Sequence, residues 1–232
     1  MAAVTHDDTT RTDRGRSAGP PQFRYPAVLV LMLSAVMVLI AAPSADWSLA
    51  LGILIESCAL VLTVATSRER ESVRQRRAIT LGLAMILAVI LIALGILPRW
   101  LTAGAAIFVT AGVPVALARG LLRLLRNHGV TLNAVAGSLA IYLSTGLIFA
   151  WVVGFIAQVS NVAYFSQHAS STQGDKVYFS FSVLTTTGFG DFTPATPAGH
   201  ALAVIEMLIG QLYLVTVIGL LIGNFAARRG PD

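Results

Sequence analysis

Six long apolar runs constrain this chain more than any other feature of the sequence. They cover residues 26–43, 48–66, 78–97, 101–118, 132–157 and 199–226, to within a few positions. Each run is close to the ~20 residues that cross a bilayer as a helix. Apolar residues make up 56% of the 232 residues and charged residues only 12%, which is outside the range of soluble domains. The sequence therefore predicts an all-α integral membrane protein with six transmembrane helices.

The positions of the basic residues predict how the chain is oriented in the membrane. Nearly all of the arginines lie in the N-terminal tail and in the segments 67–77, 118–127 and 226–230. The alternate connections hold only Arg99 and Lys176. Because positively charged connections stay in the cytoplasm, we expect a multi-pass protein of the plasma membrane with both termini on the cytoplasmic side. Trp47 and Trp100 flank two outer connections, where indole rings lie at the level of the lipid headgroups.

The same patterns divide the chain into segments. Residues 1–25 are polar and are expected to be a disordered cytoplasmic tail, with a second short tail at 227–232. Residues 26–130 are expected to form a peripheral bundle of four membrane helices that ends in an interfacial linker helix. Residues 131–226 are expected to form a second domain. An alternative for the first apolar run is a cleaved signal peptide, since the run follows arginines and ends in small residues.

The polar residues offer no recognisable enzyme site. The sequence lacks the spacing of a Ser/His/Asp triad, of a phosphate-binding glycine loop and of an HExxH zinc site, so we expect neither catalysis nor a cofactor. Cys58 is the single cysteine, which excludes a disulfide framework within the chain and a Cys/His cluster for zinc. The arginines lie between apolar runs rather than on one folded face, so nucleic acid is not an expected partner.

The connection at 158–198 holds the least helical part of the chain and is too long for a simple link between two helices. Its first part, residues 160–174, is typical of an exposed loop. The run DKVYFSFSVLTTT then predicts a short helix over about 176–186, with Asp175 as its N-cap. The segment TTTGFGD, residues 185–191, follows directly.

Non-helical backbone at membrane depth is allowed only where it is buried in protein or lines a water-filled path. Gly188 and Gly190 can adopt backbone angles barred to other residues, so that consecutive carbonyl groups can face one axis and replace the water around a cation. The partly negative C-terminal end of the preceding helix and the carboxylate of Asp191 would both favour a cation there. Thr187 and Phe189 are expected to direct their side chains away from the axis. The segment therefore predicts a pore for cations.

The stretch YFSFSVLTTTGFGD, residues 178–191, resembles the pore helix and signature sequence of the tetrameric potassium channel family. The resemblance extends over about 131–226 and is to bacterial six-helix channels with one re-entrant pore loop. It implies an outer helix, a pore helix, a selectivity filter and an inner helix in each of four identical chains. It also implies passive conduction of K⁺ as the permeant ion. The implied K⁺ ligands are the carbonyl groups of Thr186, Thr187, Gly188 and Phe189 and the hydroxyl of Thr186, with Gly190 completing the filter.

The signature departs from the commonest family pattern at three positions. Thr187 replaces the usual valine, Phe189 replaces the commoner tyrosine, and Phe179 stands where many relatives have tryptophan. A hydrogen bond that braces the filter in those relatives cannot form here, so we expect a less rigid filter. Tyr178 and Ser182 remain as expected partners of Asp191. A weakly selective channel for monovalent cations is therefore the alternative function.

Two residues of the last apolar run are further candidates. Glu206 lies in EMLIGQLY, which looks like the inner helix of bacterial members of the family. We expect Glu206 to accept a hydrogen bond from the pore helix rather than to bind the ion directly. Gly210 is either the hinge of the inner helix or a site of close helix packing. Glu56, in the second run, is a similar acid without an evident partner.

Two other channel or transport functions fit the sequence less well. Voltage sensing would need several arginines inside the fourth span, whereas residues 101–118 contain none and include Pro114. Arg119, Arg123 and Arg126 follow that span and are expected to be cytoplasmic anchors. A potassium-uptake subunit would need repeated pore loops, of which the sequence has one. We expect no cytoplasmic ligand-binding domain after the last span, because too few residues follow it.

Overall fold

A computed structural model describes residues 25–41, 46–65, 87, 90–91, 94, 98–128, 131–160, 162–167 and 170–227. Within these ranges the secondary structure is helical, apart from one isolated antiparallel bridge between Phe165 and Pro194. The main helices are α1 (Tyr25–Ala41), α2 (Asp46–Ala65), α4 (Arg99–His128), α5 (Leu132–Val159), α6 (Gln173–Leu184), α7 (Pro197–Leu212), the π-helix η1 (Tyr213–Ile218) and α8 (Gly219–Ala227). The prediction of an all-helical protein is confirmed for this part of the chain.

Four of the described helical stretches are long and apolar enough to cross a membrane. They are Trp47–Val64, Trp100–Leu122, Leu132–Val159 and Pro197–Asn224, the last formed by α7, η1 and α8 together. The helix α1 is also apolar and has 17 residues. The third expected span, 78–97, falls almost entirely outside the described residues, and so do the two expected tails. The total of six spans, and the signal-peptide alternative, therefore stay predictions.

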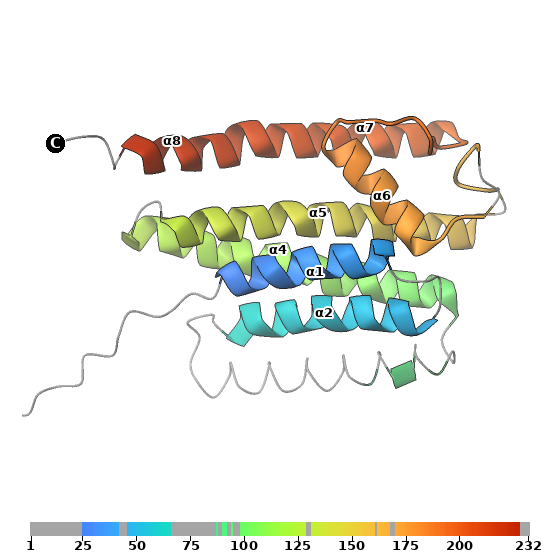
Figure 1. Ribbon diagram of the computed structural model, residues 1–232, viewed down its shortest axis with the longest axis horizontal. Coiled ribbons are helices and arrows are strands. Elements are labelled where there is room, and N and C mark those ends of the chain that lie inside the picture. Colours follow the sequence, from blue (N-terminus) through green and yellow to red (C-terminus); the bar gives the residue numbers. More distant parts are fainter. Residues whose placement is uncertain are drawn as a thin grey trace, which may run out of the picture.

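The helix α4 runs without a break from Arg99 to His128. Pro114 lies inside it, and the exposed Arg119 follows on the same helix. The residues expected to form an interfacial linker thus continue the fourth span rather than start a new helix. Only residues 129–131 separate α4 from α5, and the two helices run in opposite directions (Figure 1).

The starts of α5, α6 and α7 are each fixed by a threonine. At α5 the side chain of Thr131 accepts a hydrogen bond from the Ala134 amide at 3.3 Å. At α7 the side chain of Thr196 accepts one from the Gly199 amide. At α6 the Oγ1 of Thr172 accepts from the Asp175 amide at 3.1 Å, and the Asp175 carboxylate accepts from the Thr172 amide at 2.7 Å. The prediction that Asp175 is the N-cap was therefore wrong by three positions, because Asp175 is the reciprocal member of a capping box.

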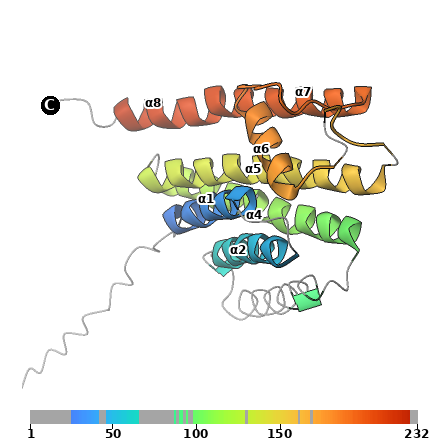
Figure 2. The same ribbon diagram turned by 45° about the vertical axis from the view of Figure 1, so that its right-hand side comes forward.

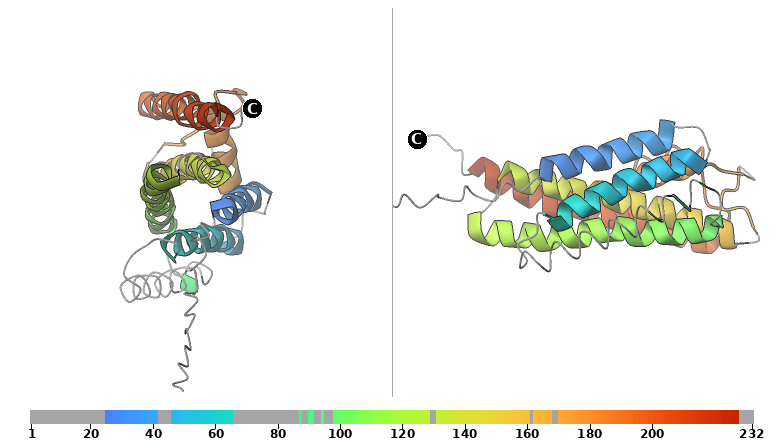
Figure 3. Two further views of the ribbon diagram at one scale, coloured as in Figure 1. Left: turned by 90° about the vertical axis from the view of Figure 1, so that its left-hand side faces the viewer. Right: turned by 90° about the horizontal axis from the view of Figure 1, so that it is seen from below.

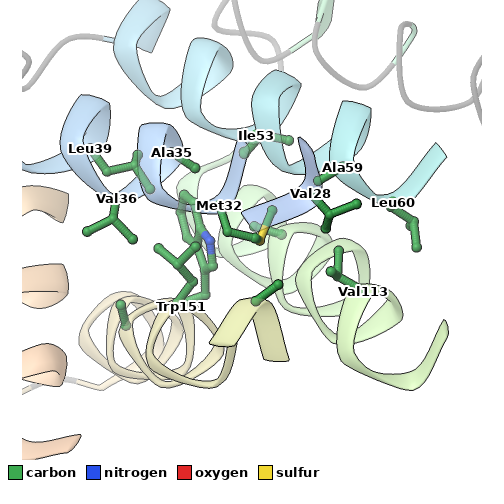
Figure 4. Packing of buried hydrophobic residues seen from close by; sticks show 14 of the residues in the cluster. Val28, Met32, Ala35, Val36, Leu39, Ile53, Ala59, Leu60, Val113 and Trp151 are labelled. Atoms are coloured by element: carbon green, nitrogen blue, oxygen red, sulfur yellow. The ribbon is translucent and has the colours of Figure 1, made fainter. Parts of the chain in front are cut away.

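The helices α1, α2, α4 and α5 lie side by side in a bundle, seen end-on in Figure 3. Its centre is filled by buried side chains from all four helices. Figure 4 shows Val28, Met32, Ala35, Val36, Leu39, Ile53, Ala59, Leu60, Val113 and Trp151 of this cluster. Since lipid tails are as apolar as these side chains, tight packing stabilises the bundle in a membrane more than removal from water does. The helices α1, α2 and α4 are thus packed directly on α5.

The C-terminal domain, from α5 to α8, is more open in the single chain. The helix α6 lies obliquely between α5 and α7 and also contacts α1 (Figures 1 and 2). The rod of α7, η1 and α8 has only 22% of its apolar stretch buried, against 50% for α5. Its exposed apolar side chains include Val204, Ile205, Leu208, Leu212, Val215, Leu220 and Ile222. This rod therefore carries an extended apolar surface that the described part of the chain does not cover.

Candidate functional site

We call residues 185–191 the signature segment. The amide groups of residues 186–189 in this segment are turned back toward the helix α6. The bonds run from the Thr186 amide to the Val183 carbonyl (2.9 Å), from the Thr187 and Gly188 amides to the Ser182 carbonyl (2.9 and 3.1 Å), and from the Phe189 amide to the Ser182 Oγ (3.3 Å). In a trans peptide the C=O of one residue points opposite to the N–H of the next. The carbonyl groups of residues 185–188 therefore point away from α6.

Every second residue of the signature segment has a positive φ. The angles are 58° at Thr186, 57° at Gly188 and 81° at Gly190. Glycine adopts such angles without strain, whereas a β-branched threonine is an outlier there at a cost of about 1–3 kcal/mol. This alternation turns successive peptide planes so that their carbonyl oxygens face one side. The structure thus turns the carbonyl groups of three expected filter residues, Thr186, Thr187 and Gly188, away from α6 as one ladder, which Phe189 and Gly190 follow along the chain.

The hydroxyl groups of Thr185 and Thr187 lie on the side of the segment that faces α6. The Oγ1 of Thr185 donates to the Phe181 carbonyl at 2.7 Å and lies 2.9 Å from the Oγ1 of Thr187. Thr187 therefore directs its side chain toward the helix, as the sequence predicts. All seven residues 185–191 are nevertheless exposed in the single chain, and the Phe189 side chain is 66% exposed.

The aromatic and polar residues of α6 surround the outer part of the segment. The ring of Phe189 stacks on Tyr178 with centroids 5.8 Å apart. Partial burial, followed by a hydrogen bond with Asp191 and the charge of that carboxylate, raises the pKa of Tyr178. Tyr178 is thus brought to Asp191, as expected. The other expected partner, Ser182, instead accepts a hydrogen bond from the Phe189 amide.

Glu206 of α7 is fully buried against α6. The hydroxyl of Ser180 contacts both its carboxyl group and the carbonyl oxygen of Gly146 on α5, the latter at 2.7 Å. Three helices meet at this one hydroxyl. The second oxygen of Glu206, Oε2, has no hydrogen-bond partner among the described residues.

Gly210 lies one turn further along α7, against the C-terminal end of α6. A Cβ atom there would overlap the carbonyl oxygen of Leu184 and come within 2.9 Å of its Cδ1. The close approach of α7 to the end of α6 therefore requires glycine. This contact supports the packing role of Gly210, while the hinge role stays a prediction.

Two features escaped the sequence reading. Glu56, expected to lack a partner, accepts hydrogen bonds from Thr110 on α4 and from the Nε1 of Trp151 on α5, the latter at 3.2 and 3.3 Å to its two oxygens. The segment 160–174, expected to be an exposed loop, buries Tyr164 and Phe165, which are 6% and 2% exposed. Burial, with a smaller contribution from the charge of Glu206, raises the pKa of Tyr164 to about 12. In the sequence, Trp151 in the middle of a span could have indicated a partner for a buried acid. The adjacent Tyr164 and Phe165 could have indicated a buried part of the polar loop.

The site offers backbone oxygens rather than a side-chain metal centre. Among the described residues no group of three or more His, Cys, Asp or Glu side chains could hold a metal ion. Oxygen ligands from carbonyl groups suit hard cations that shed their water.

Comparisons with known proteins agree with this geometry. Residues 140–226 match the family described as ion channel. A stretch of 98 residues is 32% identical to the potassium voltage-gated channel subfamily KQT member 4 of Homo sapiens, and equally to those of Rattus norvegicus and Mus musculus. It covers 40% of this chain but only 14% of each relative. No solved structure gives a significant match. The resemblance noted for residues 178–191 is confirmed, and the chain is a multi-pass membrane protein.

Proposed function

We propose, from the match of residues 140–226 to the ion channel family and from the likeness to potassium channels, that this chain forms a potassium-selective pore for passive conduction. The observation that carries the proposal is the alternation of positive φ angles at Thr186, Gly188 and Gly190. Together with the amide groups turned toward α6, it directs a ladder of carbonyl oxygens to one side of the chain. Such a ladder can replace the hydration shell of K⁺.

The proposed ligands of K⁺ are the carbonyl groups of residues 186–189 and the hydroxyl of Thr186. The helix α6 would be the re-entrant pore helix, and its C-terminal end at Leu184 lies next to the innermost ligands. The partial negative charge of that helix end favours a cation. Asp191 adds negative charge at the outer mouth. K⁺ is the transported ion, and the proposal includes neither catalysis nor a cofactor.

A homotetramer is proposed because one chain supplies only one wall of the pore. The signature segment is exposed in the single chain, and so are many apolar side chains of the rod formed by α7, η1 and α8. Three further copies would cover both surfaces and close a ring of oxygens. The short connection at 129–131 supports an arrangement in which each peripheral bundle packs on the α5 of its own chain.

The proposed topology has six spans in the plasma membrane with both termini in the cytoplasm. The spans would be α1, α2, the run 78–97, α4, α5 and the rod of α7, η1 and α8. Voltage sensing is not part of the proposal, although the named relatives are voltage-gated. The apolar stretch of α4 before Arg119 carries no arginine after Arg99, and it contains Pro114. A membrane voltage would therefore exert little force on α4, because its membrane-embedded stretch carries almost no charge.

Purified protein in planar bilayers under a K⁺/Na⁺ gradient tests the proposal. We expect single-channel currents that reverse near the K⁺ equilibrium potential. Gly188→Ala should abolish them, since the φ of 57° is strained for any residue with a Cβ atom. The matched control is Gly104→Ala on α4, where a Cβ would meet only the Phe155 ring at 3.8 Å. Absence of currents from the unaltered protein would contradict the proposal, and reversal near zero would favour the weakly selective channel.

A further inference from the structure

The segment before α6 and the segment after the signature segment are joined by backbone pairing. The Ser166 amide donates to the Thr193 carbonyl at 2.9 Å, and the Ala195 amide donates to the Tyr164 carbonyl at 2.8 Å. These bonds flank the antiparallel bridge between Phe165 and Pro194. A short stretch that precedes the helix α6 is thereby fixed to the chain just beyond the signature segment.

The side chain of Gln167 strengthens this junction at Thr193. Its Oε1 accepts a hydrogen bond from the Thr193 amide at 3.0 Å, and its Nε2 donates to the Thr193 Oγ1 at 2.7 Å. The Oγ of Ser166 also lies 2.8 Å from that Oγ1. Since Thr193 is only two residues beyond Asp191, the carboxamide of Gln167 holds the outer end of the signature segment through both backbone and side chain.

Ring contacts connect the same junction to the signature segment itself. Phe165 meets Phe192 edge to face with centroids 5.0 Å apart, and it meets Phe179 at 5.1 Å. Phe192 contacts Tyr178 at 6.0 Å, and Tyr178 stacks on Phe189. These edge-to-face and stacked arrangements are the ones that aromatic pairs prefer. A continuous series of ring contacts therefore leads from the buried Phe165 to Phe189.

We propose that Phe165 and Gln167 are positioning residues for ion selection, which act on the filter from its outer side. We call them, with their partners Thr193 and Phe192, the outer brace. This inference rests on the proposed function. Phe189 lacks a hydroxyl and Phe179 lacks an indole N–H, so the outer brace supports the filter by ring packing and by the carboxamide of Gln167. Selectivity depends on the number and arrangement of the carbonyl oxygens around the ion, and a fixed outer end limits how far that arrangement can change.

Gln167→Leu and Phe165→Leu test the outer brace in bilayers. Each removes one part of it while keeping a side chain of similar size. We expect both variants to conduct, with a ratio of K⁺ to Na⁺ permeability lowered about fivefold or more by the loss of these contacts. Gln167→Glu keeps the acceptor for the Thr193 amide and loses the donor to its Oγ1, so it should give an intermediate ratio.

Two matched controls share the chemistry but lie outside the brace. Gln158→Leu changes an exposed glutamine at the end of α5, and Phe108→Leu changes a ring on α4 that is 82% exposed. Both should keep the ratio of the unaltered protein.

An unchanged permeability ratio in conducting Gln167→Leu and Phe165→Leu channels would overturn the inference but leave the proposed function standing. Loss of tetramers in both variants, with an unchanged ratio in Gln167→Glu, would equally overturn it in favour of a role in folding alone. If the unaltered protein gives no currents, the proposed function itself fails.

Discussion

The two buried acids of this chain differ in how completely they are satisfied. Glu56 in the peripheral bundle and Glu206 in the C-terminal domain are both fully buried, and each contacts a hydroxyl on a neighbouring helix. Both oxygens of Glu56 also lie within hydrogen-bond distance of Trp151. Glu206 has only Ser180, and its Oε2 lacks a partner in the described part of the chain.

This difference suggests a structural role for Glu56, which holds helices together, and a functional role for Glu206, whose carboxyl group is only partly paired. Buried polar groups are normally paired, and a fully paired cluster fixes one arrangement of its helices. Glu56 thus locks α2 and α4 to α5. Glu206 faces α6, the helix that leads into the signature segment, and one of its carboxyl oxygens has no partner among the described residues. We therefore expect changes at Glu56 to alter stability, and changes at Glu206 to alter conduction.

The largest effect is expected at a glycine contact, where the C-terminal domain is closely packed. Gly210→Ala places a methyl group on the Leu184 carbonyl, and overpacking of this kind costs about 1–3 kcal/mol. The loss should appear in the free energy of unfolding of the purified protein, titrated with denaturing detergent in micelles. Gly104→Ala in the peripheral bundle should stay within about 0.5 kcal/mol. An altered open probability at unchanged stability would instead identify Gly210 as a hinge.

An effect of similar size concerns Glu56, the acid whose two oxygens are both paired. Glu56→Leu leaves the Nε1–H of Trp151 without its acceptor, whereas Thr110 keeps the Ala106 carbonyl at 2.8 Å. We expect a loss of about 1–3 kcal/mol in the same unfolding assay. Glu206→Leu strands no donor, because Ser180 keeps the Gly146 carbonyl, so its loss should be smaller. Equal losses at the two acids would break the comparison. Adding Trp151→Phe to Glu56→Leu should recover part of the lost stability.

A smaller effect should separate the two acids by function. Glu206→Gln keeps the shape of the side chain but places an amide beside the hydroxyl of Ser180 on α6. We expect a change of about two- to fivefold in open probability or K⁺/Na⁺ permeability ratio, which corresponds to roughly 0.4–1 kcal/mol. Glu56→Gln should leave both quantities unchanged in the same bilayer recordings. Identical responses to the two substitutions would show that the contrast is not functional.

The smallest effect is expected at Phe189, the residue that led the sequence reading to a less rigid filter. Phe189→Tyr adds a hydroxyl, but Phe179 offers no indole N–H to bind it, and the ring already stacks on Tyr178. We expect the permeability ratio to change less than about twofold. A severalfold rise, or a loss of inactivation, would instead support the less rigid filter.

The sequence predicts well what is determined locally. The apolar runs over α2, α4, α5 and α7 mark helices because length and composition suffice to cross a membrane. Gly188 and Gly190 mark the turned backbone because only glycine adopts a positive φ freely. The same rule does not predict the positive φ of Thr186. That angle is imposed by the amide contacts with α6 rather than by the preference of threonine.

Contacts between distant residues were not predictable in this way. Trp151 is 95 positions from Glu56, and Thr110 is 54 positions away, so the partners of that acid follow only from helix packing. The N-cap of α6 was misplaced because Thr172 and Asp175 bond reciprocally and both residue types favour a cap. Phe165 is buried against Phe179 and Phe192 and pairs with Pro194, all of which come later in the sequence, so loop composition does not contain that information.

The bridge between Phe165 and Pro194 has a thermodynamic consequence. It ties together the two ends of a segment of which Ser166 and Thr193, 27 positions apart, form the boundary. The helix α6 and the ladder of carbonyl groups lie inside this closed loop. The conformational entropy of these residues is therefore lost mainly when the protein folds, and not when an ion binds. If these carbonyl groups bind the ion as proposed, an arriving ion meets ligands that are already in place, and its binding is not weakened by the need to order them.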